Sequence, residues 1–312
     1  MERELGQTTL HVFFSVLLVT YIITLVGNLL IILLTLADPA LHTPMYFFLR
    51  NLSFLEVCYT SVNVPKILEN LLSGDKTISF TGCAVQTFFT FFFGGSECLL
   101  LLSMAYDRYV AICKPLHYVV LMNRKVSSGL AAGSWLSGLF MSFGHTSMVF
   151  TLSFCQSHEI NHFFCDIPPL LKLACGDISS KEMAVFVMAL LFATFPFMLI
   201  FMSYVCILST ILRMHSGEGR QKSFSTCSSH LLVVILFYGS AGIMYMKPNS
   251  SFSPSTDKFL SLSYTVLTPM LNPIIYSLKN KEVKNALSRS IGKMWPSLKI
   301  ELLQSSFSGM KS

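Results

Sequence analysis

Long apolar segments alternate with short polar ones along the chain, and seven of the apolar segments exceed the roughly 20 residues that a bilayer-spanning helix needs. The first has no charged residue from Leu10 to Ala37, and the fifth has none from Ala184 to Leu212. A backbone in hydrocarbon must satisfy its own hydrogen bonds, and the strict alternation of a membrane β-barrel is missing. The sequence therefore predicts a single all-α membrane domain over 1–312, built as a seven-transmembrane helix bundle. The expected helices cover about 10–36, 44–72, 81–113, 127–150, 181–213, 223–246 and 257–277.

A shorter amphipathic segment follows the seventh apolar run. Val283, Leu287 and Ile291 recur at i, i+4 and i+8 between lysine and arginine residues. This spacing predicts a short amphipathic eighth helix over about 280–291. Its basic face favours the anionic inner leaflet, so membrane lipids are expected partners.

Composition and charge support a membrane protein and indicate its orientation. The chain is 53% hydrophobic and 12% charged, whereas soluble domains carry about 25% charged residues. If the N-terminus is outside, most of the 22 Lys and Arg residues lie on the cytoplasmic side, as the positive-inside rule requires. The start, MERELGQTTLHVFF, lacks the basic region of a cleavable signal peptide, so the first helix is expected to act as its own insertion signal. The net charge of +6 reflects this topology and does not indicate nucleic-acid binding.

Ionisable residues inside the apolar segments indicate functional sites, because charge is costly in a bilayer. Asp107 and Arg108 end the third run within MAYDRYVAIC, and Glu56 and Glu97 lie inside the second and third runs. Two carboxyl groups inside one bundle repel each other, so either one is protonated or a cation lies between them. Each could instead be a neutral, hydrogen-bonded acid. Pro269 and the proline four residues later break backbone hydrogen bonds in the seventh run, as a hinge or as a static kink.

Four of the nine cysteines lie in the expected extracellular segments, where disulfides form. Two bridges are expected, with three possible connectivities. An alternative is a zinc or copper site, because His158 and His162 lie between two of these cysteines, but disulfide formation competes with thiolate ligation. The four cysteines are Cys83, Cys155, Cys165 and Cys175.

Five segments in this order resemble a known family over nearly the whole chain. They are LHTPMYFFLRNLSFLEVCYTSVNVPKIL, MAYDRYVAICKPLHY, KSFSTCSSHL, FYGSAGIMY and PMLNPIIYSLKNKEVKNAL. The set resembles rhodopsin-like (class A) G-protein-coupled receptors and, more narrowly, the class II, or tetrapod-type, vertebrate odorant receptors.

The resemblance implies a plasma-membrane odorant receptor that is not an enzyme. Its expected partners are a small volatile ligand, a heterotrimeric G protein of the stimulatory olfactory type that raises cAMP, and receptor-transporting chaperones. Arg108 would be held by Asp107 at rest and released to receive the G protein. The implied coupling and activation residues are Asp107, Arg108, Tyr109, Tyr204, Tyr238, Asn272, Pro273 and Tyr276.

The resemblance also implies two disulfides and a cation site. The disulfides pair Cys83 with Cys165 and Cys155 with Cys175. A sodium ion is the one cofactor expected. Most relatives have aspartate where this chain has glutamate in the second helix, and the longer side chain shifts the reach of the carboxylate. The implied sodium ligands are Glu56, Glu97 and Asn272.

The expected ligand site lies in the outer half of the bundle. The outer half of the third helix, CAVQTFFTFFFGGSE, has no aspartate to pair with an amine. An apolar pocket with a few hydroxyl groups suits small, neutral, volatile molecules. Each candidate could also be ordinary helix packing. The candidates are Phe91, Gly94, Gly95, Met188, Phe192, Ala241, Gly242, Tyr245 and Thr265.

Two other functions remain open at this stage. One is an ectopic chemosensor for a non-odorant metabolite, and the other is a cation-conducting protein that uses the two intramembrane glutamates. No Ser/His/Asp set indicates an enzyme. Odorant receptors generally have a longer N-terminus with a glycosylation sequon, whereas here the weak external sequon is at Asn249. The short N-terminus predicts impaired surface expression.

Overall fold

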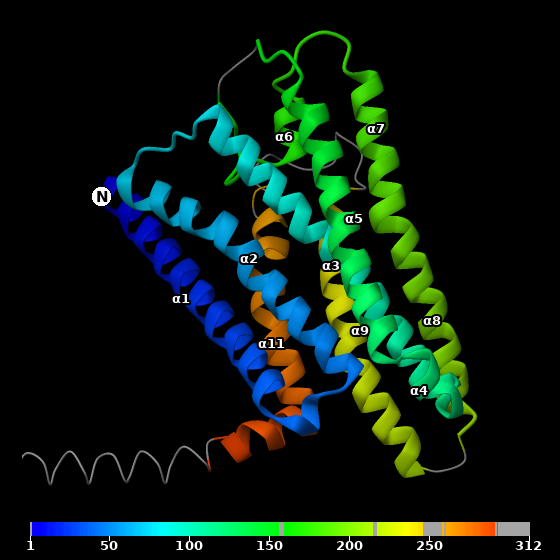
Figure 1. Ribbon diagram of the computed structural model, residues 1–312. Coiled ribbons are helices and arrows are strands. Elements are labelled where there is room, and N and C mark those ends of the chain that lie inside the picture. Colours follow the sequence, from blue (N-terminus) through cyan, green and yellow to red (C-terminus); the bar gives the residue numbers. More distant parts are fainter. Residues whose placement is uncertain are drawn as a thin grey trace, which may run out of the picture.

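The computed structural model is a bundle of long helices (Figure 1). It describes residues 2–155, 159–214, 217–245, 258, 260–290 and 292. Its first four long helices are α1 (Glu2–Ala37), α2 (Pro44–Ser73), α3 (Phe80–Cys113) and α5 (Arg124–Phe150). The fifth is continuous through α7 (Ser179–Ala189), the π-helical segment η3 (Leu190–Thr194) and α8 (Phe195–Leu212). The sixth is α9 (Gly217–Tyr245), and the seventh includes the π-helical η4 (Ser263–Leu267) and α11 (Thr268–Lys279).

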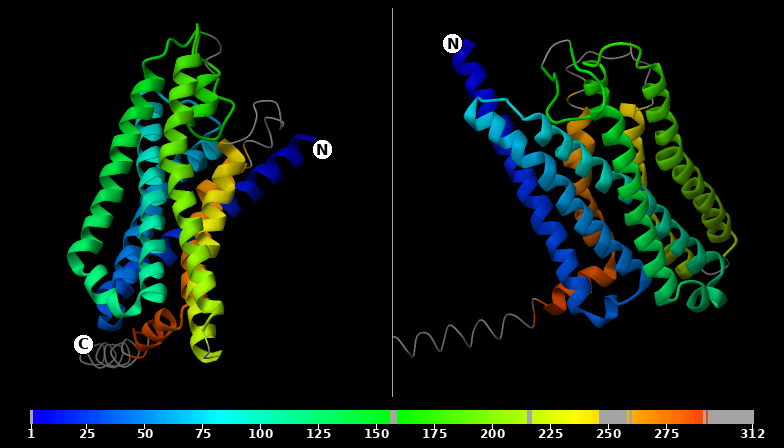
Figure 2. Two further views of the ribbon diagram at one scale, coloured as in Figure 1. Left: turned by 90° about the vertical axis from the view of Figure 1, so that its right-hand side faces the viewer. Right: turned by 45° about the horizontal axis from the view of Figure 1, so that its top comes forward.

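The prediction of an all-α bundle is confirmed over the described residues, with differences at the helix ends. Helix α1 begins at Glu2, about two turns earlier than predicted, and its amino-terminal end projects away from the other helices in Figure 2. Short helices that hydropathy did not indicate lie in the connections. They are η1 (Pro39–Leu41), η2 (Pro115–His117), α4 (Tyr118–Leu121) and α6 (Ile167–Leu171).

Among the described residues, three helical stretches are long and apolar enough to cross a membrane by length and composition alone. They are Thr8–Ala37, Phe80–Cys113 and Ser179–Leu212. Helix α2 is long enough but not apolar enough to meet this criterion, because it contains polar residues. These residues face the protein interior: Glu56 and Asn63 are fully buried. Polar side chains that point into the bundle lower the mean hydropathy of a helix without placing charge in lipid.

Helix α3 is the centre of the bundle and packs most extensively against α5. The two helices approach closely at Gly138, where an added Cβ would lie 2.7 Å from the backbone oxygen of Phe92 and from the backbone nitrogen of Ser96. A position of this kind accepts no side chain, because the obstacles are backbone atoms.

Replacing Gly138 with alanine is expected to lower the free energy of unfolding by about 3 kcal/mol, the upper part of the usual range for overpacking. The measurement is thermal unfolding of the purified chain in detergent. Gly239→Ala is the control, because a Cβ on Gly239 meets nothing within 4 Å. Equal unfolding midpoints for the two variants would contradict the proposed helix contact.

Two disulfides lie at the end of the bundle opposite Asp107 and Arg108. Cys83 bonds to Cys165 with the Cα atoms 5.5 Å apart, and Cys155 bonds to Cys175 with the Cα atoms 5.9 Å apart. Both pairs are those that the resemblance implied. The zinc or copper alternative was wrong, because it required Cys155 and Cys165 as thiolates; His158 lies outside the described residues.

A helix over 281–290 follows α11 and lies across the lower ends of α1 and α11 in Figure 1. Val283 and Ala286 are buried in the bundle core, so the apolar face of this helix packs against protein. The Nη2 atom of Arg289 lies 2.7 Å from the Oδ2 atom of Asp38, at the end of α1. The predicted surface helix is present. Ile291 lies outside the described residues.

Candidate functional site

The Asp107–Arg108 pair lies near the carboxyl-terminal end of α3, enclosed by protein. Asp107 is fully buried, and its Oδ2 atom accepts hydrogen bonds from Arg108 Nε at 3.0 Å and Nη2 at 2.5 Å. Its other oxygen, Oδ1, accepts from the hydroxyl group of Tyr118 at 2.8 Å. Both carboxylate oxygens are therefore occupied, as a buried charge requires.

Tyr118 is a member of this cluster that sequence reasoning missed. It lies on α4, in the connection after α3. Burial and the adjacent Asp107 carboxylate raise the pKa of the Tyr118 phenol, so the hydroxyl stays protonated and donates. The available signal was its position in the MAYDRYVAICKPLHY segment, where a tyrosine follows the ion pair after 11 residues.

A second contact joins α8 to α9 in the half of the bundle that contains Asp107 and Arg108. The hydroxyl group of Tyr204 lies 2.6 Å from Nδ1 of His230, and both side chains are buried. Their rings are nearly parallel, with centroids 5.8 Å apart. Sequence reasoning singled out Tyr204 and missed His230, although a histidine inside an apolar helix was a usable signal.

The other predicted activation residues divide into interior and peripheral positions. Tyr238 donates to the backbone oxygen of Cys98 at 3.1 Å, which ties α9 to α3. The buried hydroxyl group of Tyr276 has no hydrogen-bond partner among the described residues, so it is available for a new one. Tyr109 points away from this interior: its ring lies 6.0 Å from Lys114 Nζ, and it lines a groove on the outer surface of the bundle.

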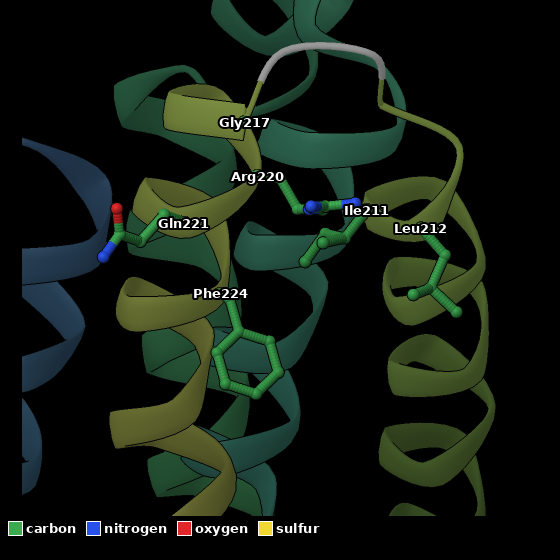
Figure 3. Close-up of a pocket in the computed structure, with 6 residues that line it drawn as sticks. All are labelled: Ile211, Leu212, Gly217, Arg220, Gln221 and Phe224. Carbon is green, nitrogen blue, oxygen red and sulfur yellow. The ribbon is translucent and has the colours of Figure 1, made fainter.

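The carboxyl-terminal end of α8 and the amino-terminal end of α9 enclose a small cleft of about 400 Å³. In Figure 3 the Arg220 side chain extends from α9 toward Ile211 of α8, whereas Gln221 points away from α8. The cleft is open to the same side of the protein as the ion pair. Its lining consists of Ile211, Leu212, Gly217, Arg220, Gln221 and Phe224.

Three predicted sodium ligands meet at the middle of the bundle. Glu56, Glu97 and Asn272 are all buried. Asn272 Nδ2 donates to Glu56 Oε1, and the two carboxyl groups are within hydrogen-bonding range of each other. One oxygen on each of the three side chains has no hydrogen-bond partner in the described structure. Oxygen donors of this kind suit a hard cation, and a cation would allow both acids to be charged.

Helix α1 contacts the seventh helix at Pro269 and Pro273, where the prolines interrupt the backbone hydrogen bonds of that helix. Asn28 Nδ2 donates to the backbone oxygen of Pro269 at 3.2 Å. Beside it, a Cβ on Gly27 would lie 3.0 Å from Pro273 Cγ, so the glycine makes room for the proline ring. This arrangement holds the bend in place; whether it acts as a hinge stays a prediction.

The residues predicted to bind ligand occupy several environments. Phe91 stacks on His145 with ring centroids 5.1 Å apart, and a Cβ on Gly95 would lie 2.8 Å from Met141 Sδ, so both positions lie at the contact between α3 and α5. Thr265 is fully buried beside Tyr59. Their role in ligand binding stays a prediction, as it does for the other candidates.

The remaining ligand candidates are less closely packed or lie outside the described side chains. A Cβ on Gly94 would touch only Tyr59, at 4.0 Å, and one on Gly242 would meet nothing within 4 Å. Met188 Cε lies 3.1 Å from the Cβ position of Gly144, and Phe192 is half-buried in η3. The side chains of Ala241 and Tyr245 and the sequon at Asn249 are outside the described part of the chain.

The long loop between α5 and α7 is attached to the seventh helix by Asp166, an aspartate that sequence reasoning did not assign to the bundle. Asp166 is fully buried, and it accepts hydrogen bonds from the Tyr264 hydroxyl group at 2.9 Å and from the Ile167 backbone nitrogen at 2.8 Å. Gln86 of α3 accepts from the backbone nitrogen of Cys165 at 3.0 Å. The loop therefore covers the outer end of the bundle.

These features define a helical bundle with a buried ion pair at one end and a loop that covers the other end. Residues 17–293 match the family described as olfactory receptor. Human olfactory receptor 10A2 is 56% identical over 280 residues, which cover 90% of this chain and 92% of that protein. Human olfactory receptor 10A5 is 57% identical over 281 residues, 90% of this chain and 89% of that protein. Mouse olfactory receptor 2C1 is 49% identical over 282 residues, 90% of each chain.

The chain belongs to the olfactory receptor family. It is therefore an odorant receptor and a multi-pass protein of the plasma membrane, and it belongs to a family of signalling receptors rather than enzymes.

Proposed function

We propose that this receptor binds small, mostly apolar volatile molecules in the outer half of the bundle and activates a stimulatory, olfactory-type G protein, which raises cAMP. The observation that carries the proposal is the buried Arg108–Asp107–Tyr118 cluster at the cytoplasmic end. A buried arginine of this kind can adopt two arrangements. In one its guanidinium group is paired with Asp107, and in the other the planar guanidinium group is free to donate hydrogen bonds to a partner.

Activation requires the cytoplasmic ends of α8 and α9 to move apart from α3. The contact between Tyr204 and His230 joins α8 to α9, and the hydrogen bond from Tyr238 joins α9 to α3. This movement breaks the hydrogen bond between Tyr238 and Cys98, rearranges the contact between Tyr204 and His230, and frees Arg108 for the G protein. A ligand drives this change to the extent that it binds the open arrangement more tightly.

The outer half supports a neutral ligand. Helix α3 has no acidic residue between Phe80 and Ser96, so an ammonium group has no carboxylate on that helix to pair with. The candidate residues Phe91, Gly94 and Thr265 offer apolar surface and one hydroxyl group. The attachment of the loop that carries Asp166 to the outer end of the bundle supports a ligand that is small and apolar.

The proposal includes the orientation and the cellular partners. The N-terminus is extracellular and the C-terminus is cytoplasmic, in agreement with the distribution of Lys and Arg. Receptor-transporting chaperones bring the chain to the surface. The alternative is that the receptor is an ectopic chemosensor for a non-odorant metabolite.

The test is a cAMP reporter assay in cells that express the tagged receptor with the olfactory stimulatory G protein and a receptor-transporting chaperone. A panel of small volatiles is applied, and surface staining is read in parallel. A dose-dependent rise in cAMP is the expected result. Normal surface staining with no response to apolar volatiles, but a response to charged metabolites, would overturn the assignment of the ligand class.

Replacing Tyr118 with phenylalanine is expected to raise cAMP in the absence of ligand several-fold. A hydrogen bond to a charged group contributes about 1.5–3 kcal/mol, and here it stabilises the carboxylate that holds Arg108. The readout is basal cAMP at matched surface levels. Tyr106→Phe is the control, because Tyr106 lies on the lipid-facing surface of α3. Equal basal signals in the two variants would contradict the role of Tyr118.

We also propose that a sodium ion binds between Glu56, Glu97 and Asn272 and stabilises the resting arrangement. Their unpartnered oxygens support the proposal. The thermal midpoint of the purified receptor is expected to be a few degrees higher in sodium chloride than in choline chloride, because an ion that binds only the folded state stabilises it. Glu56→Gln should lose this difference, and the exposed acid Glu69→Gln should keep it. An unchanged difference in Glu56→Gln would contradict the site.

A further inference from the structure

A buried histidine lies in the outer half of the bundle, next to the long loop. His145 is on α5, and its side chain is only 2% exposed. Its ring stacks on Phe91 of α3, with the ring centroids 5.1 Å apart and the ring planes 16° from parallel. One helical turn further along α5, Val149 belongs to the same buried cluster as Cys165 of the loop. The ring of His145 therefore lies one turn inward from the loop that covers this end of the bundle.

Three of the candidate ligand residues meet around this histidine. Phe91 contacts the ring directly. The methyl group of Met188, on α7, lies against the glycine that precedes His145 in the sequence. The backbone oxygen that contacts the His145 ring belongs to Met141, and the Sδ atom of Met141 lies 2.8 Å from the Cβ position of Gly95. Helices α3, α5 and α7 therefore converge on one polar side chain that sequence reasoning did not name.

The hydrogen bond that His145 makes determines its tautomer. Its Nδ1 atom lies 3.0 Å from the backbone oxygen of Met141. A carbonyl oxygen can only accept, so Nδ1 carries the proton and donates. The ring is neutral, because a buried charge without a partner is costly and no carboxylate in the described part of the chain pairs with it. A neutral imidazole has one N–H, so the other nitrogen, Nε2, is a hydrogen-bond acceptor.

Two asparagines show how side chains with this local arrangement are used elsewhere in the bundle. Asn51 and Asn63 each donate from Nδ2 to the backbone oxygen four residues earlier, as His145 does from Nδ1. The side-chain oxygen of Asn51 accepts from Trp135 at 3.2 Å, and that of Asn63 accepts from Thr90 at 3.1 Å. Each asparagine thus accepts from a donor on a neighbouring helix. The acceptor of His145 has no such donor among the described residues.

We propose that Nε2 of His145 accepts a hydrogen bond from the ligand, so the receptor prefers volatiles with a hydroxyl group, such as alcohols and phenols, to ketones of the same size. This inference rests on the proposed odorant site and specifies the ligand chemistry of that site. A hydroxyl group satisfies the buried acceptor, whereas a ketone brings only a second acceptor and leaves Nε2 unpaired. The Phe91 ring beside it offers apolar surface to the hydrocarbon part of the ligand.

The test compares secondary alcohols with the ketones that have the same carbon skeletons, in the cAMP assay with surface staining. The wild-type receptor is expected to respond to the alcohols at concentrations about 10-fold lower, the effect of one hydrogen bond whose acceptor the ketone leaves unpaired. His145→Phe keeps a flat ring beside Phe91 and removes the acceptor, so its responses to alcohol and ketone should be equal.

Two further variants make the test specific to the acceptor. His145→Asn should keep the preference for alcohols, because asparagine can donate to Met141 and accept with its oxygen, as Asn63 does. Ser147→Ala is the matched control, because Ser147 is an exposed residue of the same helix whose hydroxyl group also bonds to its own backbone. This variant should respond as the wild type does.

A second measurement needs neither a variant nor the G protein. The thermal midpoint of the purified wild-type receptor should rise more with an alcohol than with its ketone at the same concentration, because the more tightly bound ligand stabilises the folded state more. Equal effects of alcohols and ketones on the wild type, or an unchanged alcohol preference in His145→Phe, would overturn this inference and leave the odorant function in place. Normal surface staining with no response to any volatile would overturn both.

Discussion

Replacing Arg108 with alanine is expected to abolish ligand-stimulated cAMP at unchanged surface levels. The guanidinium group is the only cation in the buried cluster with Asp107 and Tyr118, and the proposed mechanism uses it to receive the G protein. The readout is the maximal cAMP response to an active volatile, normalised to surface staining. Arg108→Lys should restore only part of the response, because lysine keeps the charge without the planar fork.

Two controls separate loss of coupling from loss of folding. Removing one partner of a buried ion pair costs about 3–5 kcal/mol when the other charge stays unpaired. The double variant Asp107→Asn with Arg108→Ala removes both charges, so it should reach the surface normally and still fail to signal. Arg124→Ala changes an exposed arginine at the start of α5 and should signal normally. A full cAMP response from the double variant would contradict the role of Arg108.

Replacing Cys165 with serine is expected to prevent delivery of the receptor to the cell surface. The bond to Cys83 joins positions 82 residues apart and attaches the extracellular loop to the top of α3. Loss of a native disulfide costs about 2–5 kcal/mol. The backbone of Cys165 also bonds to Gln86 and Thr87, and both contacts need the loop in place. The measurement is surface staining against total protein.

The matched variants make this prediction specific. Cys83→Ser should give the same loss, and the double variant should be no worse than either single one, because all three lack the same bond. Cys206→Ser removes an exposed free cysteine and should leave surface levels unchanged. Cys155→Ser should have a smaller effect, because its bridge spans only 20 residues and the entropy of loop closure grows with loop length. Normal surface levels in Cys83→Ser would contradict the prediction.

The sequence predicted the helices well, because the bilayer imposes a minimum apolar length on each one. It also pointed to the ion pair, since charge at the end of an apolar run is conspicuous. It could not supply Tyr118 or His230 as partners, because hydropathy reports that a residue is buried and says nothing about which remote side chain it meets. Ala286 shows the same limit: the spacing predicted an apolar face, and the structure shows that this face packs on protein.

The disulfide pairs were available only through the family resemblance, because four cysteines allow three pairings and spacing alone does not choose among them. The fully buried Asp166 was also beyond reach. An aspartate in a polar extracellular loop is usually solvated, and the fact that this one enters the bundle depends on Tyr264, nearly 100 positions later.

The fifth helix contains a π-helical segment at Leu190–Thr194. Adding or removing one residue in this segment would rotate the side chains of α7 around the helix axis. A π-helical turn accommodates one residue more than an α-helix does, and each residue of an α-helix corresponds to a rotation of about 100°. Deleting one residue within this segment would rotate Met188 and the rest of α7 around the helix axis while Tyr204, on the cytoplasmic side, keeps its contact with His230. With the ligand site proposed above, a single-codon insertion or deletion here would change ligand preference and leave the contact between Tyr204 and His230 in place.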